Sequence, residues 1–373
     1  MKIKAFKGLR PTVEKASAIA SLPYDVVNFA QAKEQAEGKP LSFMRVVRSE
    51  IELPEGTEPY SDTVYNHAKE NFQKLVDGGH MVREDAPCMY LYRQVMGDHA
   101  QTGLVATFSA EDYDADVIKK HEKTREAKEN DRYMLTRTLR VNTGPVFLTV
   151  RDGTLLDKIV ETFDAIPCAY VADGHHRSAS NARCARIFKG ENPNHTGDED
   201  YNWFLSVVFP AGQLAILPYN RVVRDLNGAT KDEFLAKLAQ VCKLEKTGVK
   251  APVGSKNVSM YIDGQWYSLS FDNTDGLDAV SSLDVALLQD RVLAPLLGIG
   301  DPRTDERIDF VGGIKGTDEL EKLVNSKEFA VAFSMYPTTT DQLMAIADAG
   351  QIMPPKSTWF EPKLRSGLFV HTF

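Results

Sequence analysis

The feature that most constrains the fold is an abrupt change of pattern near residue 173. Residues 168–172 (Cys-Ala-Tyr-Val-Ala) are mainly apolar and predict a buried strand. The turn Asp173-Gly174-His175-His176-Arg177 follows at once, and the alanine-rich stretch 178–188 after it predicts a helix. We therefore expect a strand, a tight turn and a helix in direct succession at this point of the chain.

Such a turn is suited to binding phosphate. The start of a helix leaves N–H groups unpaired at the positive end of the helix dipole, and Gly174 lets the backbone come close to a ligand. Arg177 adds a planar fork of donors, and His175 and His176 add donors or proton shuttles. The alternative is that Asp173 only caps the helix and both histidines are ordinary surface groups. We favour phosphate binding, because five such residues in a row are hard to explain by packing.

A carboxylate that could act as a base precedes this motif. Glu122 lies in His121-Glu122-Lys123-Thr124, at the start of a polar stretch that predicts a helix over residues 122–140. A carboxylate beside a phosphate site can accept the proton of an attacking hydroxyl. Alternatively, Glu122 belongs to a solvated charged face, which is common at helix starts. A zinc-protease motif is excluded, because it needs a second histidine where Arg125 stands.

A third candidate is the loop Pro354-Pro355-Lys356-Ser357-Thr358. Its prolines reduce the entropy of the unfolded chain, and its ammonium and hydroxyl groups suit a substrate carboxylate or a phosphate. The alternative is a plain exposed loop. The glycine-containing loops 298–300 and 312–316 lack the spacing of known phosphate-binding loops, so we predict turns there.

Composition limits the class of protein. The 373 residues, 43% of them hydrophobic, are enough for two or three domains with their own cores. The net charge of -8 gives no general attraction to nucleic acid or anionic lipid, so we expect neither as a partner. The four cysteines form no C-x-x-C pair, which predicts reduced thiols that fill the core. The start of the chain lacks a signal-peptide core and no window approaches the about 20 apolar residues of a membrane span, so we expect a cytoplasmic protein.

Periodicity and turn residues predict the other elements of a mixed α+β fold. They are a helix over 60–76, a hairpin of 88–95 with 103–108 across the turn 97–101, a strand over 146–150, a hairpin of 257–262 with 266–271, a helix over 282–297, a strand over 329–335 and a helix over 340–349.

Several motifs together resemble the bacterial family called domain of unknown function 1015 (DUF1015), over nearly the full length of the chain. They are Leu22-Pro23-Tyr24-Asp25-Val26, His121-Glu122-Lys123-Thr124, Asp131-Arg132, Ala172-Asp173-Gly174-His175-His176-Arg177 and Pro355-Lys356-Ser357-Thr358.

From about residue 120 to 360 the chain is also distantly similar to the free-serine kinases of the ParB/sulfiredoxin superfamily. This chain and the free-serine kinases share three motifs in the same order. The motifs are His-Glu, Asp-Gly-His-His-Arg and a late Gly-x-x-x-x-Pro-Lys-[Ser/Thr]-Thr, which here runs from Gly350 to Thr358. The kinases continue with Arg-His, whereas this chain has Trp359-Phe360. Two other branches of the superfamily fit less well. Sulfiredoxin-like chemistry would need a cysteine where His175 stands. ParB-like DNA clamps carry Gly-Glu-Arg-Arg at the turn, which this chain does not have.

The resemblance implies a nucleotide-dependent kinase that phosphorylates a small hydroxyl compound, with free L-serine as the first guess. ATP or ADP would place its phosphates on the turn, with Asp173, His175 and His176 catalytic and Gly174, His175, His176 and Arg177 in contact with phosphate. Glu122 would be the base, Mg²⁺ would bridge the phosphates, and Lys356, Ser357 and Thr358 would bind the substrate. The alternative is a ParB-like regulator that binds nucleotide without turnover, and a homodimer is one possible assembly.

Turn residues and periodicity divide the chain into three regions, and the resemblance implies that the α+β fold has a central ParB/sulfiredoxin-like nucleotide-binding fold. Residues 1–105 would form an N-terminal α/β domain and 106–215 the catalytic region with the Asp-Gly-His-His-Arg motif. Residues 216–373 would form a C-terminal α/β region that completes the substrate cleft.

Overall fold

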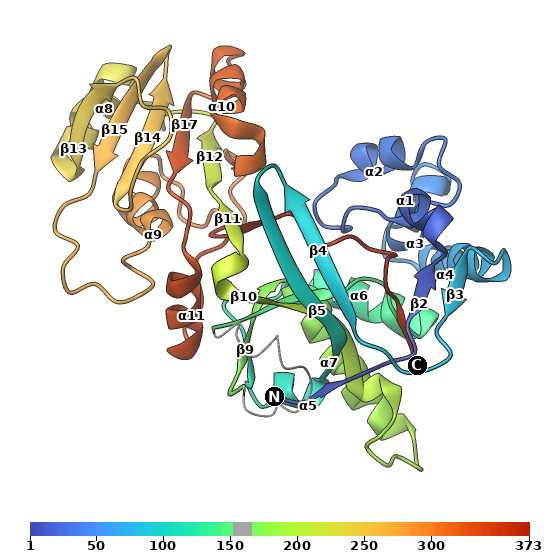
Figure 1. Cartoon of the computed structure of the whole chain (residues 1–373). Coiled ribbons are helices and arrows are strands. Elements are labelled where there is room, and N and C mark those ends of the chain that lie inside the picture. Colours follow the sequence, from blue (N-terminus) through green and yellow to red (C-terminus); the bar gives the residue numbers. More distant parts are fainter. Residues whose placement is uncertain (152–165) are drawn as a thin grey trace. The chain divides into compact units, whose positions relative to one another are not determined.

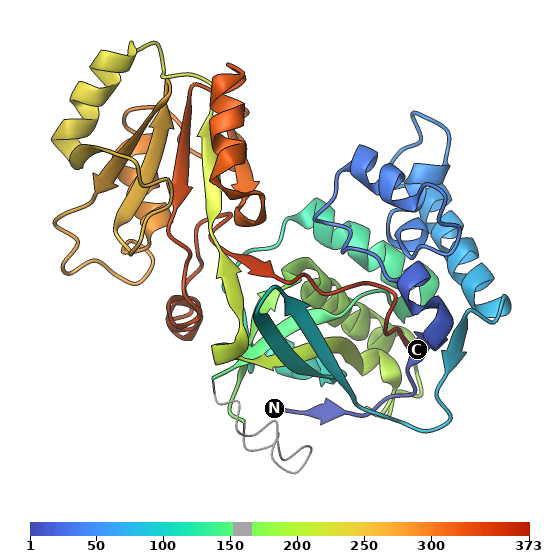
Figure 2. The ribbon, with the colours of Figure 1, turned by 45° about the horizontal axis from the view of Figure 1, so that its top comes forward.

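The computed structural model describes residues 1–151 and 166–373. The chain forms two compact units, which Figures 1 and 2 follow by colour along the sequence. Unit 1 comprises residues 1–214 and 362–373, and unit 2 comprises residues 215–361. Unit 2 is thus inserted into unit 1, which the C-terminal segment rejoins.

Unit 1 is built around a seven-stranded mixed sheet of order β1-β5-β10-β8-β9-β6, with β4 paired to β5. Strands β10 and β8 run parallel, and β8 and β9 antiparallel. All residues of β8 are buried, which explains its continuous apolar sequence. The strands are β1 (Ile3–Lys4), β4 (Tyr90–Met96), β5 (His99–Ser109), β6 (Ile118–Lys119), β8 (Val146–Val150), β9 (Ala169–Asp173) and β10 (Trp203–Pro210).

The helices of unit 1 pack on this sheet and on one another. Helices α6 and α7 are in contact, and the small side chains of Ala182 and Ala185 place α7 in the same apolar core as Val171 of β9. A second core joins α4 to the N-terminal segment and to Val370 near the C-terminus. The helices are α1 (Ala16–Ile19), α2 (Phe29–Ala36), α3 (Met44–Val47), α4 (Asp62–Asp77), α5 (Ala110–Asp114), α6 (Glu126–Leu139) and α7 (His175–Glu191).

Two short ribbons complete unit 1. Strand β2 (Leu9–Pro11) pairs with β3 (Met81–Arg83), and β7 (Val141–Asn142) pairs with β19 (His371–Thr372). The second pairing fastens the C-terminal segment to unit 1.

Unit 2 contains a six-stranded sheet of order β13-β15-β14-β17-β12-β16 in which every pair is antiparallel. In Figure 2 the orange-red helix α10 lies along this sheet, where Leu320 joins the core around Val222 and Trp266. Strand β11 (Ala215–Leu217) pairs with β18 (Trp359–Glu361) where the chain enters and leaves the unit. The remaining elements are β12 (Tyr219–Val223), α8 (Lys231–Val241), β13 (Lys243–Thr247), β14 (Asn257–Ile262), β15 (Gln265–Ser270), α9 (Asp284–Leu288), β16 (Ile308–Gly312), α10 (Gly316–Asn325), β17 (Val331–Met335) and α11 (Thr340–Asp348).

The predicted α+β class is confirmed, and so are most predicted elements, among them β8, the hairpin of β14 and β15, and α11. Some predicted boundaries were wrong. The long hairpin of β4 and β5 (Figure 1) turns through Gly97 and Asp98 alone, because pairing continues to Met96 and His99. The helix predicted over 122–140 begins only at Glu126, and the one predicted over 178–188 begins at His175.

The helix predicted over 282–297 is also different. It consists of α9 followed by a π-helical turn over Gln289–Leu293. In the part of the chain that the structure describes, no helix is long and apolar enough to cross a membrane.

Candidate functional site

The turn between β9 and α7 has the geometry of an anion-binding corner. Gly174 has φ 94°, in the left-handed region that glycine adopts without strain, and it caps α7. The first bond of the helix runs from the Ser178 N–H to the Gly174 carbonyl, 2.9 Å. The N–H groups of His175, His176 and Arg177 therefore lie in the first turn, where a helix offers them no acceptor.

Asp173 holds the turn from the strand side. Its Oδ1 accepts a hydrogen bond from the Gly174 N–H at 2.7 Å, and its Oδ2 lies 3.0 Å from Nζ of Lys363. Burial alone would raise the pKa of Asp173, but the charges of Lys363 and Arg177 outweigh it and hold that pKa well below its ordinary value. Asp173 is therefore a carboxylate at neutral pH.

His175 forms a buried pair with His121. The two rings meet edge to face with centroids 4.4 Å apart, and each residue is at most 5% exposed. Burial lowers the pKa of His175 to about 4 and that of His121 well below its ordinary value, so both rings are neutral at pH 7. Nε2 of His175 and both ring nitrogens of His121 have no hydrogen-bond partner among the described residues. Buried polar atoms usually have such a partner, so these nitrogens are exceptions to the general rule.

The loop before α6 brings Glu122 to this turn. Oε2 of Glu122 lies 3.8 Å from Nδ1 of His175, and its side chain is 45% exposed. The Arg125 N–H donates to Nε2 of His176 at 3.0 Å, which leaves the ring proton on Nδ1 and ties the loop to the start of α7. Burial lowers the pKa of His176, although Glu122 acts against it. The structure thus brings Glu122 and the turn together.

Arg177 lies beneath the turn. It is 8% exposed, its Nη1 donates to the Pro145 carbonyl, and its Nε has no partner among the described residues. A Cβ at Gly174 would lie 3.2 Å from that Nε. Gly174 is therefore required both for its backbone conformation and for the room that it leaves to the guanidinium.

Two further motifs of the family resemblance adjoin the turn, and no role was predicted for their residues. The guanidinium carbon of Arg132 lies 3.9 Å from the ring centroid of Tyr24, and Arg132 pairs with Asp131 at 2.6 Å. Burial raises the pKa of Tyr24, while the charges of Arg132 and Arg177 act to lower it. The only sequence signal for this group was the shared motifs.

Lys363, the partner of Asp173, had no signal in the sequence. It follows β18 in a segment without a recognisable motif and reaches a residue 190 positions earlier in the chain.

The loop predicted to bind substrate lies in unit 2. Lys356 has φ 58°, and its Nζ donates to the hydroxyl of Tyr219 at 3.1 Å. The hydroxyl of Ser357 is buried and donates to the Pro354 carbonyl at 2.6 Å. Ser357 thus closes the turn of its own loop, and the role of Lys356, Ser357 and Thr358 in binding substrate stays a prediction.

Protein ligands for a metal ion are few. Among the described residues, no three His, Cys, Asp or Glu side chains form a group that could hold a metal ion. The predicted site offers the carboxylates of Glu122 and Asp173. Mg²⁺ often takes only one or two protein carboxylates and completes its shell with phosphate and water. Two carboxylates would fit a Mg²⁺ ion held mainly by nucleotide phosphates, but not a metal ion held by protein ligands alone.

A comparison with protein families identifies the chain. Residues 3–163 and 150–286 match the family described as "Protein of unknown function (DUF1015)". The chain therefore belongs to the DUF1015 family. No curated protein matches it.

Solved structures show more distant likenesses. A free serine kinase in complex with AMP is 14% identical, with a TM-score of 0.40, 71% of this chain covered and 91% of that one. A conserved hypothetical protein from Pyrococcus furiosus is 14% identical, with a TM-score of 0.40, 72% of this chain covered and 95% of that one. SbnI from Staphylococcus aureus, truncated at its C-terminus, is 14% identical, with a TM-score of 0.42 and coverage of 72% and 87%.

Proposed function

We propose that this protein is a nucleotide-dependent kinase that transfers a phosphoryl group to a small hydroxyl compound, with free L-serine as the first acceptor to test. The observation that carries the proposal is the approach of the Glu122 carboxylate, 3.8 Å from His175, to a helix start with unpaired N–H groups. A phosphate site and a base for the acceptor hydroxyl are the two parts that such a reaction needs.

The donors of the turn support phosphate binding. The N–H groups of His175, His176 and Arg177 offer several hydrogen bonds at the positive end of α7. The buried guanidinium of Arg177 adds positive charge. Its Nε has no hydrogen-bond acceptor among the described residues. Asp173 carries a negative charge here, but Lys363 neutralises it. The local charge therefore favours an anion.

Glu122 suits the role of base. Its side chain is half-exposed, so a substrate can reach it. In the proposed step the acceptor oxygen bonds to the terminal phosphorus of ATP or ADP and the bond from that phosphorus to its bridging oxygen breaks. The hydroxyl proton passes to Glu122, and the shortened nucleotide leaves. Neutral His175 lies beside Glu122, at 3.8 Å between Nδ1 and Oε2. Mg²⁺, when bound, would neutralise charge on the phosphates.

The test is the formation of O-phosphoserine from serine and Mg²⁺ with ATP or ADP, followed by ³¹P NMR on the full chain. Because general bases contribute about 10²- to 10⁴-fold, Glu122→Gln should lower kcat by that factor. Glu126→Gln is the matched control, since Glu126 opens α6 in the same segment and is exposed. Asp173→Ala should also lose activity, because it removes the partner of Lys363.

If nucleotide binds but no hydroxy amino acid is phosphorylated with either donor, the kinase proposal is wrong. Tight binding without turnover would instead favour the regulator that binds nucleotide alone.

A further inference from the structure

Unit 2 contains a cavity of about 290 Å³, and Pro354 and Pro355 of the loop predicted to bind substrate form part of its wall. It lies between the middle of β12, the helical segment that starts with α9 and the loop after it. Its walls are mainly apolar, and four charged or amide side chains line it. The lining residues are Arg221, Val285, Gln289, Leu293, Gly300, Asp301, Pro302, Arg303, Phe310, Pro354 and Pro355.

Arg221 is the unusual member of this lining. It is 3% exposed, and its two terminal nitrogens donate to the carbonyls of Tyr219 and Lys356. No carboxylate of the described residues lies within ion-pair distance of it. Burial accordingly lowers the pKa of this guanidinium to about 10, and Tyr219 only partly opposes that shift. A buried charge without a counter-ion is costly, which points to a partner from outside the chain.

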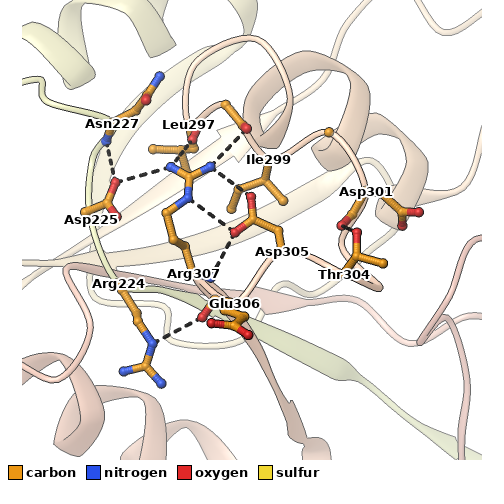
Figure 3. Close-up of polar contacts among 12 residues, drawn as sticks. Arg224, Asp225, Asn227, Leu297, Ile299, Asp301, Thr304, Asp305, Glu306 and Arg307 are labelled. Atoms are coloured by element: carbon orange, nitrogen blue, oxygen red, sulfur yellow. Dashed lines mark hydrogen bonds and ion pairs between the residues drawn. The ribbon is translucent and has the colours of Figure 1, made fainter.

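Arg307 in the same unit shows how a purely structural arginine is held. Figure 3 shows its guanidinium between the carboxylates of Asp225 and Asp305, at 3.4 and 2.9 Å, and the carbonyl of Leu297. These carboxylates raise the pKa of Arg307, with Asp305 as the main cause. Arg307 is thus neutralised by its surroundings, whereas Arg221 is held by carbonyls alone.

The other charges of the cavity do not compensate Arg221. Asp301 already pairs with Arg303, at 3.0 Å between Oδ1 and Nε, so the lining as a whole keeps one excess positive charge. The π-helical turn Gln289–Leu293 forms part of the wall, and such turns within α-helices are frequent at functional sites.

We propose that this cavity binds a small organic carboxylate, whose carboxyl group pairs with Arg221 and whose short apolar body contacts Val285, Leu293 and Phe310. A carboxylate matches the planar fork of a guanidinium. The cavity is at the lower end of the size of small-molecule pockets, so it suits a compact ligand rather than a nucleotide.

Calorimetric titration of the full chain tests this inference with isovalerate as the probe and its neutral amide, isovaleramide, as the matched ligand. Isovalerate should bind and isovaleramide should not. Arg221→Gln should weaken binding of isovalerate by about 10- to 100-fold, because it removes a charge-assisted pair. Arg224→Gln is the control, since Arg224 follows the same strand, is about half-exposed and lies outside the cavity lining.

Hydrogen exchange of the wild-type chain keeps the inference testable if Arg221→Gln does not fold. Isovalerate should protect residues 284–303 and 354–356 from exchange. The inference is overturned if isovalerate does not bind, if the amide binds equally well, or if protection falls elsewhere. It is also overturned if inorganic phosphate binds in preference, which would assign the cavity to a different anion.

Discussion

At the scale of single residues, Asp173 and Lys363 form the ion pair that fixes the edge of the proposed site. The side chains are 25% and 10% exposed, so removal of one partner leaves a charge in a poorly solvated place. We expect Lys363→Met to lower the free energy of unfolding by about 2 kcal/mol, a value between exposed and fully buried pairs. Urea denaturation measures it.

A double-mutant cycle separates this pair from general damage. Asp173→Asn combined with Lys363→Met should cost less than the sum of the two single changes, because the pair is already lost after the first. If the losses in unfolding free energy of the two single variants add exactly in the double variant, Asp173 and Lys363 do not stabilise each other.

At the scale of elements, the entry into α7 depends on Gly174. We expect Gly174→Ala to destabilise the protein by about 1–2 kcal/mol, because an alanine at φ 94° is strained and its Cβ would crowd Arg177. Gly190→Ala in the same helix is the matched control. Gly190 has open space around it, so the change should stabilise by about 0.5–1 kcal/mol. Thermal or urea unfolding checks both, and equal effects would contradict the role of the turn.

Local sequence predicted regular elements well where one pattern dominated. The apolar run of β8 predicted that strand correctly, because a strand buried on both faces has a continuous apolar sequence. The Asp263-Gly264 turn predicted the hairpin of β14 and β15 correctly, because a two-residue turn leaves a strong local signal. The start of α7 was missed, since His175, His176 and Arg177 have ordinary helix propensity and only the left-handed Gly174 marks the boundary. The start of α6 was missed because charged residues continue from the loop into the helix.

At the scale of the whole molecule, the long-range partners could not be predicted. Lys363 reaches Asp173, and His371 binds Asn142, across about half the chain, and neither contact has a local pattern. The grouping of Glu122 with the turn was predicted from the shared motifs. The structure divides the chain into two compact units. The finer division into three regions at residues 105 and 215 stays a prediction.

The buried histidines make unit 1 sensitive to acid. Burial lowers the pKa of both His175 and His371 to about 4, from an ordinary value of 6.5, and lowers that of His121 as well. Above pH 6.5 these rings are neutral in both the folded and the unfolded chain, so they do not change stability. As pH falls from 6.5 towards 4 only the unfolded chain takes up these protons, so stability should drop, by at most about 3 kcal/mol each for His175 and His371.

Urea unfolding at several pH values between about 7 and 5 checks this expectation. His175→Asn and His371→Asn should each flatten the dependence on pH. A stability that is constant over this range, or that rises on acidification, would show that these histidines are protonated in the folded protein.

Hydrogen exchange at the β9–α7 turn tests the central claim most directly, since it measures the N–H groups that are proposed to hold phosphate. With ATP or ADP and Mg²⁺ added to the full chain, the amides of His175, His176 and Arg177 should exchange more slowly, because each gains an acceptor at a helix start that offers none. If a nucleotide binds and these amides exchange as before, or if no nucleotide binds at all, the turn is not the phosphate site.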